Sequence, residues 1–314
     1  MRVIHVLVYR SISVKGFVFI LSSGGFTVSI WEAIIQGLVQ GLSEFLPISS
    51  SGHLSLVQHF TSQNGENAVF FSILLHAGTL VAVFLAFRQL IGRLILEFFR
   101  MVKDIFTGRF HFRDRNPERN MIIMLFISLL PLLPFYLFKD FFEKVASDQD
   151  ILVEGFCFLY TALLLFLSDR CVKGKKTIGQ INVRNAVTVG VFQGVALLPG
   201  VSRSGSTITS GLFCGFSRET AVQFSFILGI PAILGGILTE IPSASAASAQ
   251  IGVAPMIVGF VTAAVVGFLA IQMVSWLIKS DRFRIFAVYT ALLGLAVISI
   301  GIYEHITGTM LVLG

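Results

Sequence analysis

The chain has 314 residues, of which 55% are apolar and 13% are charged, whereas soluble domains usually carry roughly 25% charged residues. With 31 phenylalanines and a mean hydropathy of +0.85 it cannot cover a water-facing surface, which excludes a disordered chain, a coiled coil and a soluble enzyme. A net charge of +6 would favour nucleic acid as a partner of a soluble protein, but here the basic residues lie in short loops between apolar runs. We therefore predict a polytopic membrane protein with the lipid bilayer, and no nucleic acid, as its partner.

The first 28 residues do not predict a clear element. Three basic residues interrupt an otherwise apolar stretch: Arg2, Arg10 and Lys15. Three interpretations stay open for this leader: a poor first span, a signal-like segment without an evident cleavage site, or a mistranslated leader with the true start nearer Val28. We expect residues 29–314 to form a single integral membrane domain.

Two stretches of the first half are apolar without resembling a simple crossing. Ile30–Phe60 is broken in the middle by Pro47, a cluster of serines and Gly52. Ile91–Phe106 carries charged side chains along its length, which predicts an amphipathic helix at the membrane interface.

A helix needs about 20 mainly apolar residues to cross a membrane, and seven further stretches come close to this length or exceed it. Six of them contain no Lys, Arg, Asp or Glu: Asn67–Phe87, Asn120–Phe138, Asn185–Ser202, Thr220–Thr239, Ile241–Ile278 and Ile285–Tyr303. The seventh, Ile151–Ser168, has Glu154 near its start. Together these stretches predict an all-α membrane helix bundle.

The loops between these stretches differ in basic charge, which sets orientation in a membrane. Three loops are rich in Lys and Arg and are predicted to be cytoplasmic: Arg88–Arg119, Asp169–Arg184 and Lys279–Arg284. Three are poor in them and are predicted to lie outside: Gln58–Asn67, Lys139–Asp150 and Glu240–Val253. The two kinds alternate along the chain, which supports the predicted spans.

The chain resembles itself at an offset of 153 residues. The matches are Gly37-Leu-Val-Gln-Gly41 with Gly190-Val-Phe-Gln-Gly194, Gly52 with Gly205, and Phe71-Ser72 with Phe224-Ser225. The copies, about 30–87 and 183–240, each predict a helix, a broken or re-entrant segment and a long helix. Because the first copy ends at a cytoplasmic loop and the second at an outside loop, we predict inverted-topology repeats, whose polar sites lie between them.

The first break carries a polar stripe and a buried charge. Gln36, Gln40 and Glu44 recur at every fourth position, on one face of a helix. A carboxylate at this depth costs about 2.5 kcal/mol or more, so Glu44 is expected to face a polar cavity. The alternative is a protonated Glu44 that forms hydrogen bonds between helices.

Serines and a histidine follow Glu44. Ser49–Ser51 either satisfy backbone groups freed by Pro47 or, with Glu44 and His53, supply a hydroxyl nucleophile, a carboxylate and an imidazole to one pocket. His59 and His76 are expected to be structural, because no second polar group clusters with them in the sequence.

The second break carries one permanent cation. Arg203 is the only charged residue between Arg184 and Arg218, and its planar guanidinium suits phosphate oxygens. Hydroxyl donors surround it: Ser202, Ser204, Ser206 and Thr207. This pattern is typical of an anion-binding nest. The alternative is that Arg203 pairs with Glu44 as a structural bridge between the repeats.

Both breaks resemble the undecaprenyl-diphosphate phosphatase family of the bacitracin-resistance type. The matching motifs are Gln40-Gly-Leu-Ser-Glu44-Phe-Leu-Pro-Ile-Ser-Ser-Ser-Gly-His53 and Leu198-Pro-Gly-Val-Ser-Arg-Ser-Gly-Ser-Thr207. Together they are highly specific, and the similarity covers about residues 30–303. In this chain Gln40 stands where many members carry a second Glu, and an amide cannot act as a base, so a scheme that needs two carboxylates there is in doubt.

The resemblance implies a membrane hydrolase that converts undecaprenyl diphosphate to undecaprenyl phosphate and inorganic phosphate, recycling the lipid carrier of cell-wall synthesis. It also implies a divalent cation, Mg²⁺ or Ca²⁺, and a site that opens toward the outer face of the bacterial inner membrane. A homodimer is compatible with so apolar a bundle. The implied catalytic residues are Glu44 as metal ligand or base, Ser50 as preferred nucleophile, His53 as rival nucleophile or proton donor, and Arg203. The implied substrate-binding residues are Gln40, Ser49, Ser202, Ser204 and Thr207.

The strongest competing interpretation is a secondary transporter or lipid flippase for an anionic substrate. Inverted repeats and broken helices are typical of transporters, and Arg203 would then recognise the substrate. A type 2 phosphatidic-acid phosphatase is rejected, because the His and Asp expected after Ser202-Arg203 are missing. The cysteines Cys157, Cys171 and Cys214 have no metal-ligand spacing and receive no role.

Overall fold

The computed structural model describes residues 28–61, 66–109, 116–138, 150–171, 173–244, 251–279 and 283–311. Its α-helices are α1 (Ile30–Phe45), α2 (Ser50–Phe60), α3 (Glu66–Ala86), α4 (Arg88–Phe106), α5 (Pro117–Leu129), α6 (Leu132–Tyr136), α8 (Leu152–Asp169), α9 (Val183–Val195), α10 (Arg203–Phe213), α11 (Arg218–Ala244), α12 (Val253–Lys279) and α13 (Arg284–Thr307). Over these ranges the predicted all-α class is confirmed. Residues 1–27 of the predicted leader lie outside them.

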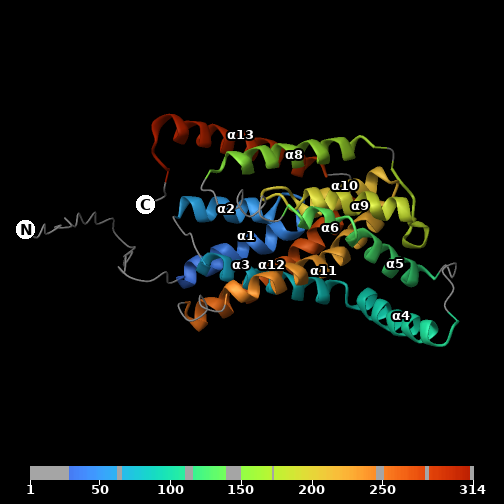
Figure 1. Cartoon of the computed structure of the whole chain (residues 1–314). Helices are drawn as coiled ribbons and strands as arrows, with labels where there is room; N and C mark the ends of the chain where they lie inside the picture. Colours follow the sequence, from blue (N-terminus) through green and yellow to red (C-terminus); the bar gives the residue numbers. More distant parts are fainter. Residues whose placement is uncertain are drawn as a thin grey trace, which may run out of the picture.

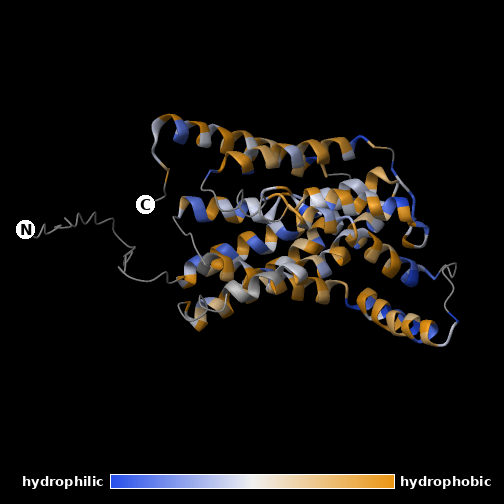
Figure 2. Cartoon of the chain, in the orientation of Figure 1, coloured by the Kyte–Doolittle hydropathy of each residue, from blue (hydrophilic) through white to orange (hydrophobic). Residues whose placement is uncertain are grey.

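Six regions of the described helices are long and apolar enough to cross a membrane: Val69–Ala86, Pro117–Phe135, Leu152–Asp169, Arg218–Leu238, Val253–Leu277 and Arg284–Thr307. Each coincides with a predicted span. Their outer faces stay apolar, as Val261, Val265 and Leu269 on α12 illustrate, since they recur every fourth residue and are all exposed. Figure 2 shows that hydrophobic residues dominate these long helices. The chain is a multi-pass membrane protein.

The predicted crossing at Asn185–Ser202 is wrong. Helix α9 has 13 residues and ends at Val195, far short of a crossing. Pro199 then disfavours helical backbone at the residue before it, and Gly200 adopts a φ of 88°, a conformation that side chains other than glycine rarely take. The apolar run therefore divides into a short helix and a turn that leads into α10.

The two breaks have matching helices. Both α2 and α10 have 11 residues, and they begin at Ser50 and Arg203, which keeps the 153-residue offset. At about 1.5 Å per residue neither helix crosses a hydrocarbon core of about 30 Å. In Figure 1 both lie between the α8–α13 pair and the group formed by α3, α11 and α12. The inverted sense of the two repeats stays a prediction.

Glycines let the helices around the breaks approach closely. A Cβ atom added at Gly37 or Gly41 of α1 would lie 2.9 Å from a backbone oxygen of α12. On the other side of the molecule, a Cβ atom at Gly294 of α13 would lie 2.9 Å from the Gly155 carbonyl oxygen of α8. Small residues at such interfaces allow tight packing where lipid gives no hydrophobic driving force. The breaks are thus held between rigidly packed helix pairs.

Helix α4 has the predicted amphipathic character. Its buried Glu97 accepts a hydrogen bond from Arg119 Nε at 2.8 Å, whereas Phe99 and Phe106 are exposed. Its position at the membrane interface stays a prediction.

Candidate active site

The two breaks contact each other through reciprocal hydrogen bonds. The backbone N–H of Gly200 donates to Ser51 Oγ at 3.2 Å, and Ser204 Oγ donates to the Leu46 carbonyl oxygen at 3.1 Å. Ser51 and Ser204 are separated by the 153-residue repeat offset, and each binds backbone of the opposite break. The segments that the sequence singled out separately therefore form one site.

Glu44 lies at the centre of this site and is almost fully buried. Its Oε2 atom accepts hydrogen bonds from Ser50 Oγ at 2.7 Å and from Gln40 Nε2 at 3.0 Å. Its Oε1 atom accepts a hydrogen bond from Nη2 of Arg203. The predicted bridge between Glu44 and Arg203 is thus present as an ion pair. The arrangement joins a hydroxyl, a carboxylate and a guanidinium.

Arg203 reaches Glu44 because α11 makes room for its side chain. A Cβ atom added at Gly229 would collide with the Arg203 guanidinium. The repeat counterpart of Gly229 is His76, so the two long helices present different residues at equivalent positions. Gly229 leaves room for the Arg203 guanidinium, whereas His76 contributes an imidazole ring.

The expectation that His76 lies apart from other polar groups is wrong. Its Nε2 atom is 3.7 Å from Glu44 Oε2, and its Nδ1 atom hydrogen-bonds the Ser72 carbonyl oxygen at 2.8 Å. The sequence held one signal for this placement, since Ser72, one turn before His76, belongs to the repeat match. His59 also has a polar partner, since it hydrogen-bonds Glu304 of α13 at 3.0 Å, and its structural role stays a prediction.

The hydroxyls predicted around Arg203 are buried. Those of Ser202, Ser204 and Thr207 form hydrogen bonds within the chain, whereas Ser206 Oγ has no hydrogen-bond partner among the described residues. Ser202 caps α10 by accepting a hydrogen bond from the Gly205 N–H at 3.0 Å. Thr207 Oγ1 bonds the Arg203 carbonyl oxygen at 2.9 Å and Ser225 Oγ at 2.6 Å. These contacts fix the N-terminal turn of α10, whose positive dipole end lies beside the guanidinium.

His53 has its contacts with α2, α8 and α13. Its Nδ1 atom contacts the Ser49 carbonyl oxygen at 2.6 Å, and its Nε2 atom contacts the hydroxyl of Tyr289 at 2.7 Å. Its ring also packs on Phe158 with centroids 5.3 Å apart. None of the bonds that His53 forms with described residues reaches Glu44 or Arg203. The structure therefore brings Glu44, Ser50 and Arg203 together and places His53 beside them, against α13.

The turn before α2 is strained at Ser49. Its φ of 74° is the only positive value among the described non-glycine residues. Such strain persists where surrounding contacts enforce it and is frequent at functional sites. Here Ser49 caps α2 through the Gly52 N–H at 3.2 Å, and its carbonyl oxygen contacts His53.

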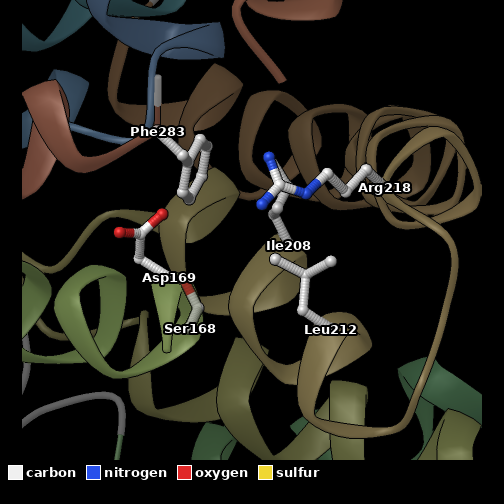
Figure 3. A pocket seen from close by; sticks show the side chains of 6 residues that line it. All are labelled: Ser168, Asp169, Ile208, Leu212, Arg218 and Phe283. Atoms are coloured by element: carbon white, nitrogen blue, oxygen red, sulfur yellow. The ribbon is translucent and has the colours of Figure 1, made fainter. Parts of the chain in front are cut away.

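A pocket lies toward the C-terminal end of α10. Ser168, Asp169, Ile208, Leu212, Arg218 and Phe283 line it (Figure 3). Ile208 and Leu212 lie more than one helical turn after Arg203, so this pocket is separate from the Glu44 cluster.

The donor groups at Glu44 suit a hard cation that is only partly held by protein. No group of three His, Cys, Asp or Glu side chains placed for a metal ion occurs within the described ranges. However, Gln40 Oε1 is buried without a hydrogen-bond partner, and the Nε2 atom of the same amide donates to the Glu44 carboxylate. Mg²⁺ is commonly held by one or two carboxylates together with substrate phosphates and water. The residues present fit that mode of binding.

Comparison with known proteins places these motifs in a family. The family described as bacitracin resistance protein BacA matches residues 33–296, which include both breaks. A protein of Alkaliphilus metalliredigens (strain QYMF) named undecaprenyl-diphosphatase is 37% identical over 273 residues, covering 86% of this chain and 98% of the relative. A Treponema denticola protein of the same name is 38% identical over 273 residues, covering 85% and 96%. The chain belongs to the bacitracin resistance protein BacA family.

Proposed function

We propose that this chain hydrolyses undecaprenyl diphosphate to undecaprenyl phosphate and inorganic phosphate, which returns the lipid carrier to cell-wall synthesis. The observation that carries the proposal is the Glu44 carboxylate, which binds the Ser50 hydroxyl on one oxygen and Arg203 on the other. Relatives that carry the name undecaprenyl-diphosphatase support the substrate. A diphosphate head group with an apolar tail matches a charged site inside a lipid-facing bundle.

In the proposed mechanism Ser50 is the nucleophile. Its Oγ atom forms a bond to the terminal phosphorus while its proton passes to Glu44 Oε2, which already accepts that hydrogen bond at 2.7 Å. The bond between the terminal phosphorus and the bridging oxygen breaks, and undecaprenyl phosphate leaves. Glu44 then gives the proton from Ser50 to solvent and takes a proton from a water molecule, whose oxygen forms a bond to the phosphoserine phosphorus. The bond between that phosphorus and Ser50 Oγ breaks, Glu44 returns a proton to Ser50 Oγ, and inorganic phosphate leaves.

His53 is assigned the proton donor rather than the nucleophile. It follows Ser50 by three positions on α2, so the two side chains share one face of the helix. Both of its ring nitrogens already have partners, whereas a nucleophile needs a free lone pair directed at phosphorus. As donor, the charged His53 ring would exchange its Nε2–H hydrogen bond to the Tyr289 hydroxyl for one to the departing phosphate oxygen and pass the proton there, after which Nε2 would again accept a hydrogen bond from Tyr289.

Arg203 would hold the diphosphate and stabilise the charge that develops on the transferred group. Gln40 and Ser49 are proposed to contact phosphate oxygens from the first break. Ser202, Ser204 and Thr207 are proposed to do so from the second, together with the amides that begin α10. Substrate binding would separate Arg203 from Glu44, since the phosphates compete for the guanidinium.

A divalent cation, Mg²⁺ or Ca²⁺, is proposed as the cofactor. Glu44 and the unpartnered Gln40 Oε1 would hold it with the help of phosphate oxygens. When bound, it would neutralise phosphate charge. The family resemblance and the oxygen atoms of Glu44 and Gln40 are the support for proposing that activity requires this cation.

The proposed location is the bacterial cytoplasmic (inner) membrane, with the site open to its outer face. The support is the alternation of basic and non-basic loops in the sequence. We also propose a homodimer, for which the apolar outer faces of the helices are the support.

The test is phosphate release from undecaprenyl diphosphate by detergent-purified wild type and Glu44→Gln, each with Mg²⁺, Ca²⁺ or a chelator. We expect metal-dependent release by wild type and none above background by the variant. Glu219→Gln is the matched control, since Glu219 is exposed and lies in the first turn of α11, outside the site. No release by well-folded wild type would refute the phosphatase and favour transport of an anionic substrate.

A further inference from the structure

Tyr289 of α13 contacts the proposed catalytic group His53, and no sequence motif points to this contact. Its hydroxyl lies 2.7 Å from His53 Nε2, and the two rings stack with centroids 5.7 Å apart and planes 11° from parallel. The residues are 236 positions apart in the chain. A stacked ring and a hydrogen bond from the same side chain restrain both the position and the rotation of the imidazole.

The hydrogen bonds determine which imidazole nitrogen carries the proton. Ser49 presents a carbonyl oxygen, which accepts hydrogen bonds and cannot donate them, so His53 Nδ1 must carry a hydrogen. In the neutral ring Nε2 is then the acceptor, and the Tyr289 hydroxyl donates to it. In the charged ring Nε2–H donates to the Tyr289 oxygen instead. The hydroxyl serves both protonation states at the same atom.

The placement of a tyrosine at this position requires a reason. Tyr289 is 43% exposed on α13, where its neighbours Ile285, Val288 and Leu292 are exposed apolar residues. A hydroxyl group on a lipid-facing surface is costly to desolvate unless it has a partner, and phenylalanine would suit that surface better. The chain contains 31 Phe and only 5 Tyr, and a tyrosine stands here. His53 supplies the partner.

The helix that carries Tyr289 is fixed relative to His53. A second tie between α2 and α13 joins His59 to Glu304 at 3.0 Å. Helix α13 also packs tightly on α8 at Gly155 and Gly294, and α8 supplies Phe158 to the other side of His53. Two contacts along α2 and one shared neighbour therefore fix the register of α13, which keeps the Tyr289 hydroxyl on Nε2.

We propose that Tyr289 is a positioning residue for catalysis: it holds the His53 imidazole with Nε2 as the atom that takes up and releases the proton. The inference rests on the proposed function, because His53 matters as proton donor only if phosphate transfer occurs. Tyr289 acts through His53 and does not contact the phosphates.

The kinetic test uses Tyr289→Phe, which keeps the stacked ring and removes the hydroxyl. We expect kcat to fall about tenfold, the effect of losing one hydrogen bond to a reacting group, with KM within about twofold of wild type. Tyr303→Phe is the matched control on the same helix, and it should keep full activity, because the Tyr303 side chain is half exposed and far along α13. An unchanged kcat for Tyr289→Phe, or a loss confined to KM, would overturn the proposal.

A double variant separates action through His53 from other effects. In a His53→Gln background, the change Tyr289→Phe should lower the residual rate by less than about twofold, because the two groups act as a unit. A further tenfold loss would show that Tyr289 acts on the fold or the substrate directly, and would overturn the assignment.

A spectroscopic test does not depend on activity. In protein with ¹⁵N-labelled imidazoles, the Nε2 resonance of His53, identified by its loss in His53→Gln, should shift in Tyr289→Phe. The resonances of the other five histidines should not move. An unmoved His53 resonance would refute the contact whether or not the chain is a phosphatase. If wild type released no phosphate and the His53 resonance still shifted in Tyr289→Phe, the proposed function would be refuted and the contact between Tyr289 and His53 would stand.

Discussion

The two breaks have similar backbone structures and differ in the charged side chains that they carry. In each, a serine caps an 11-residue helix by accepting from the N–H three residues later, and contacts the serine two positions on: Ser49 with Ser51 and Ser202 with Ser204. The first break adds a carboxylate, and the second adds a guanidinium. One structural unit used twice thus brings opposite charges together inside a membrane bundle.

The breaks also obtain their sharp turns differently. The first holds Ser49 at a φ of 74°, whereas the second holds Gly200 at 88° and leaves Ser202 at an ordinary −71°. Glycine adopts such a conformation without strain, and serine does not. The comparison shows that the strain is concentrated in the break that carries the proposed nucleophile.

The largest effect is expected for Arg203→Ala, which removes the cation from the second break. We expect phosphate release to fall about a thousandfold or more, because no other described cation lies within ion-pair distance of Glu44 except the imidazole of His76. Membrane insertion, measured by extraction and size-exclusion chromatography, should be retained. Substantial turnover by this variant would remove Arg203 from the phosphate site.

Gly229→Ala tests the room that α11 provides for the guanidinium. The added Cβ atom collides with Arg203 and displaces it, and a displacement of about 1 Å costs up to about a hundredfold in rate. We expect kcat/KM to fall about tenfold to a hundredfold in the phosphate-release assay. The control is Gly235→Ala on the same helix, where nothing lies within 4 Å of the added atom. Equal activity of the two variants would contradict this account of Gly229.

Ser49→Gly and Ser202→Gly should change stability in opposite directions. Glycine at Ser49 relieves a conformation that costs about 1–3 kcal/mol and loses only a few tenths as a helix cap, so the free energy of unfolding should rise by about 1 kcal/mol. Glycine at Ser202 relieves no strain and should lower the free energy of unfolding by roughly a few tenths of a kcal/mol. Denaturation of the detergent-purified variants measures both. Shifts of the same sign would show that Ser49 is not strained.

The smallest effect is expected for Gln40→Glu. The change places a second carboxylate beside Glu44, in a motif that admits either residue, and we expect kcat to stay within about threefold of wild type at saturating metal. Phosphate release at several metal concentrations measures this. Loss of activity would show that the Gln40 amide, which donates to Glu44 Oε2, is specifically required.

Much of the fold could be predicted because crossing a membrane imposes a local rule, about 20 apolar residues. That rule identified all six described regions that are long and apolar enough to cross a membrane, and it failed at Asn185–Ser202, where Pro199 and Gly200 override apolar composition. The pairing of Glu44 with Arg203 could be foreseen as an alternative, because each is the only charge in its apolar segment. The motifs alone could not decide between a bridge and a substrate site.

The contacts of His76 and Tyr289 could not be predicted for a shared physical reason. Each side chain lies on a long apolar helix whose periodicity indicates only that it crosses the membrane. Which residue of that helix meets a break depends on helix register, which the glycine contacts at Gly155, Gly259 and Gly294 set. Those contacts join segments far apart in the sequence, and no local pattern reports them.

The Glu44–Arg203 pair has a consequence for how the protein is made. The two residues are 159 positions apart, so at a synthesis rate of about 5–20 residues per second Glu44 exists for roughly 8 to 30 seconds before its cation. During that interval the carboxylate must enter the membrane with partners from its own half. Gln40 and Ser50 adjoin it, and His76 arrives on the very next long helix. The first half therefore supplies polar partners for its own charge, and the second half adds Arg203 to them when the chain is complete.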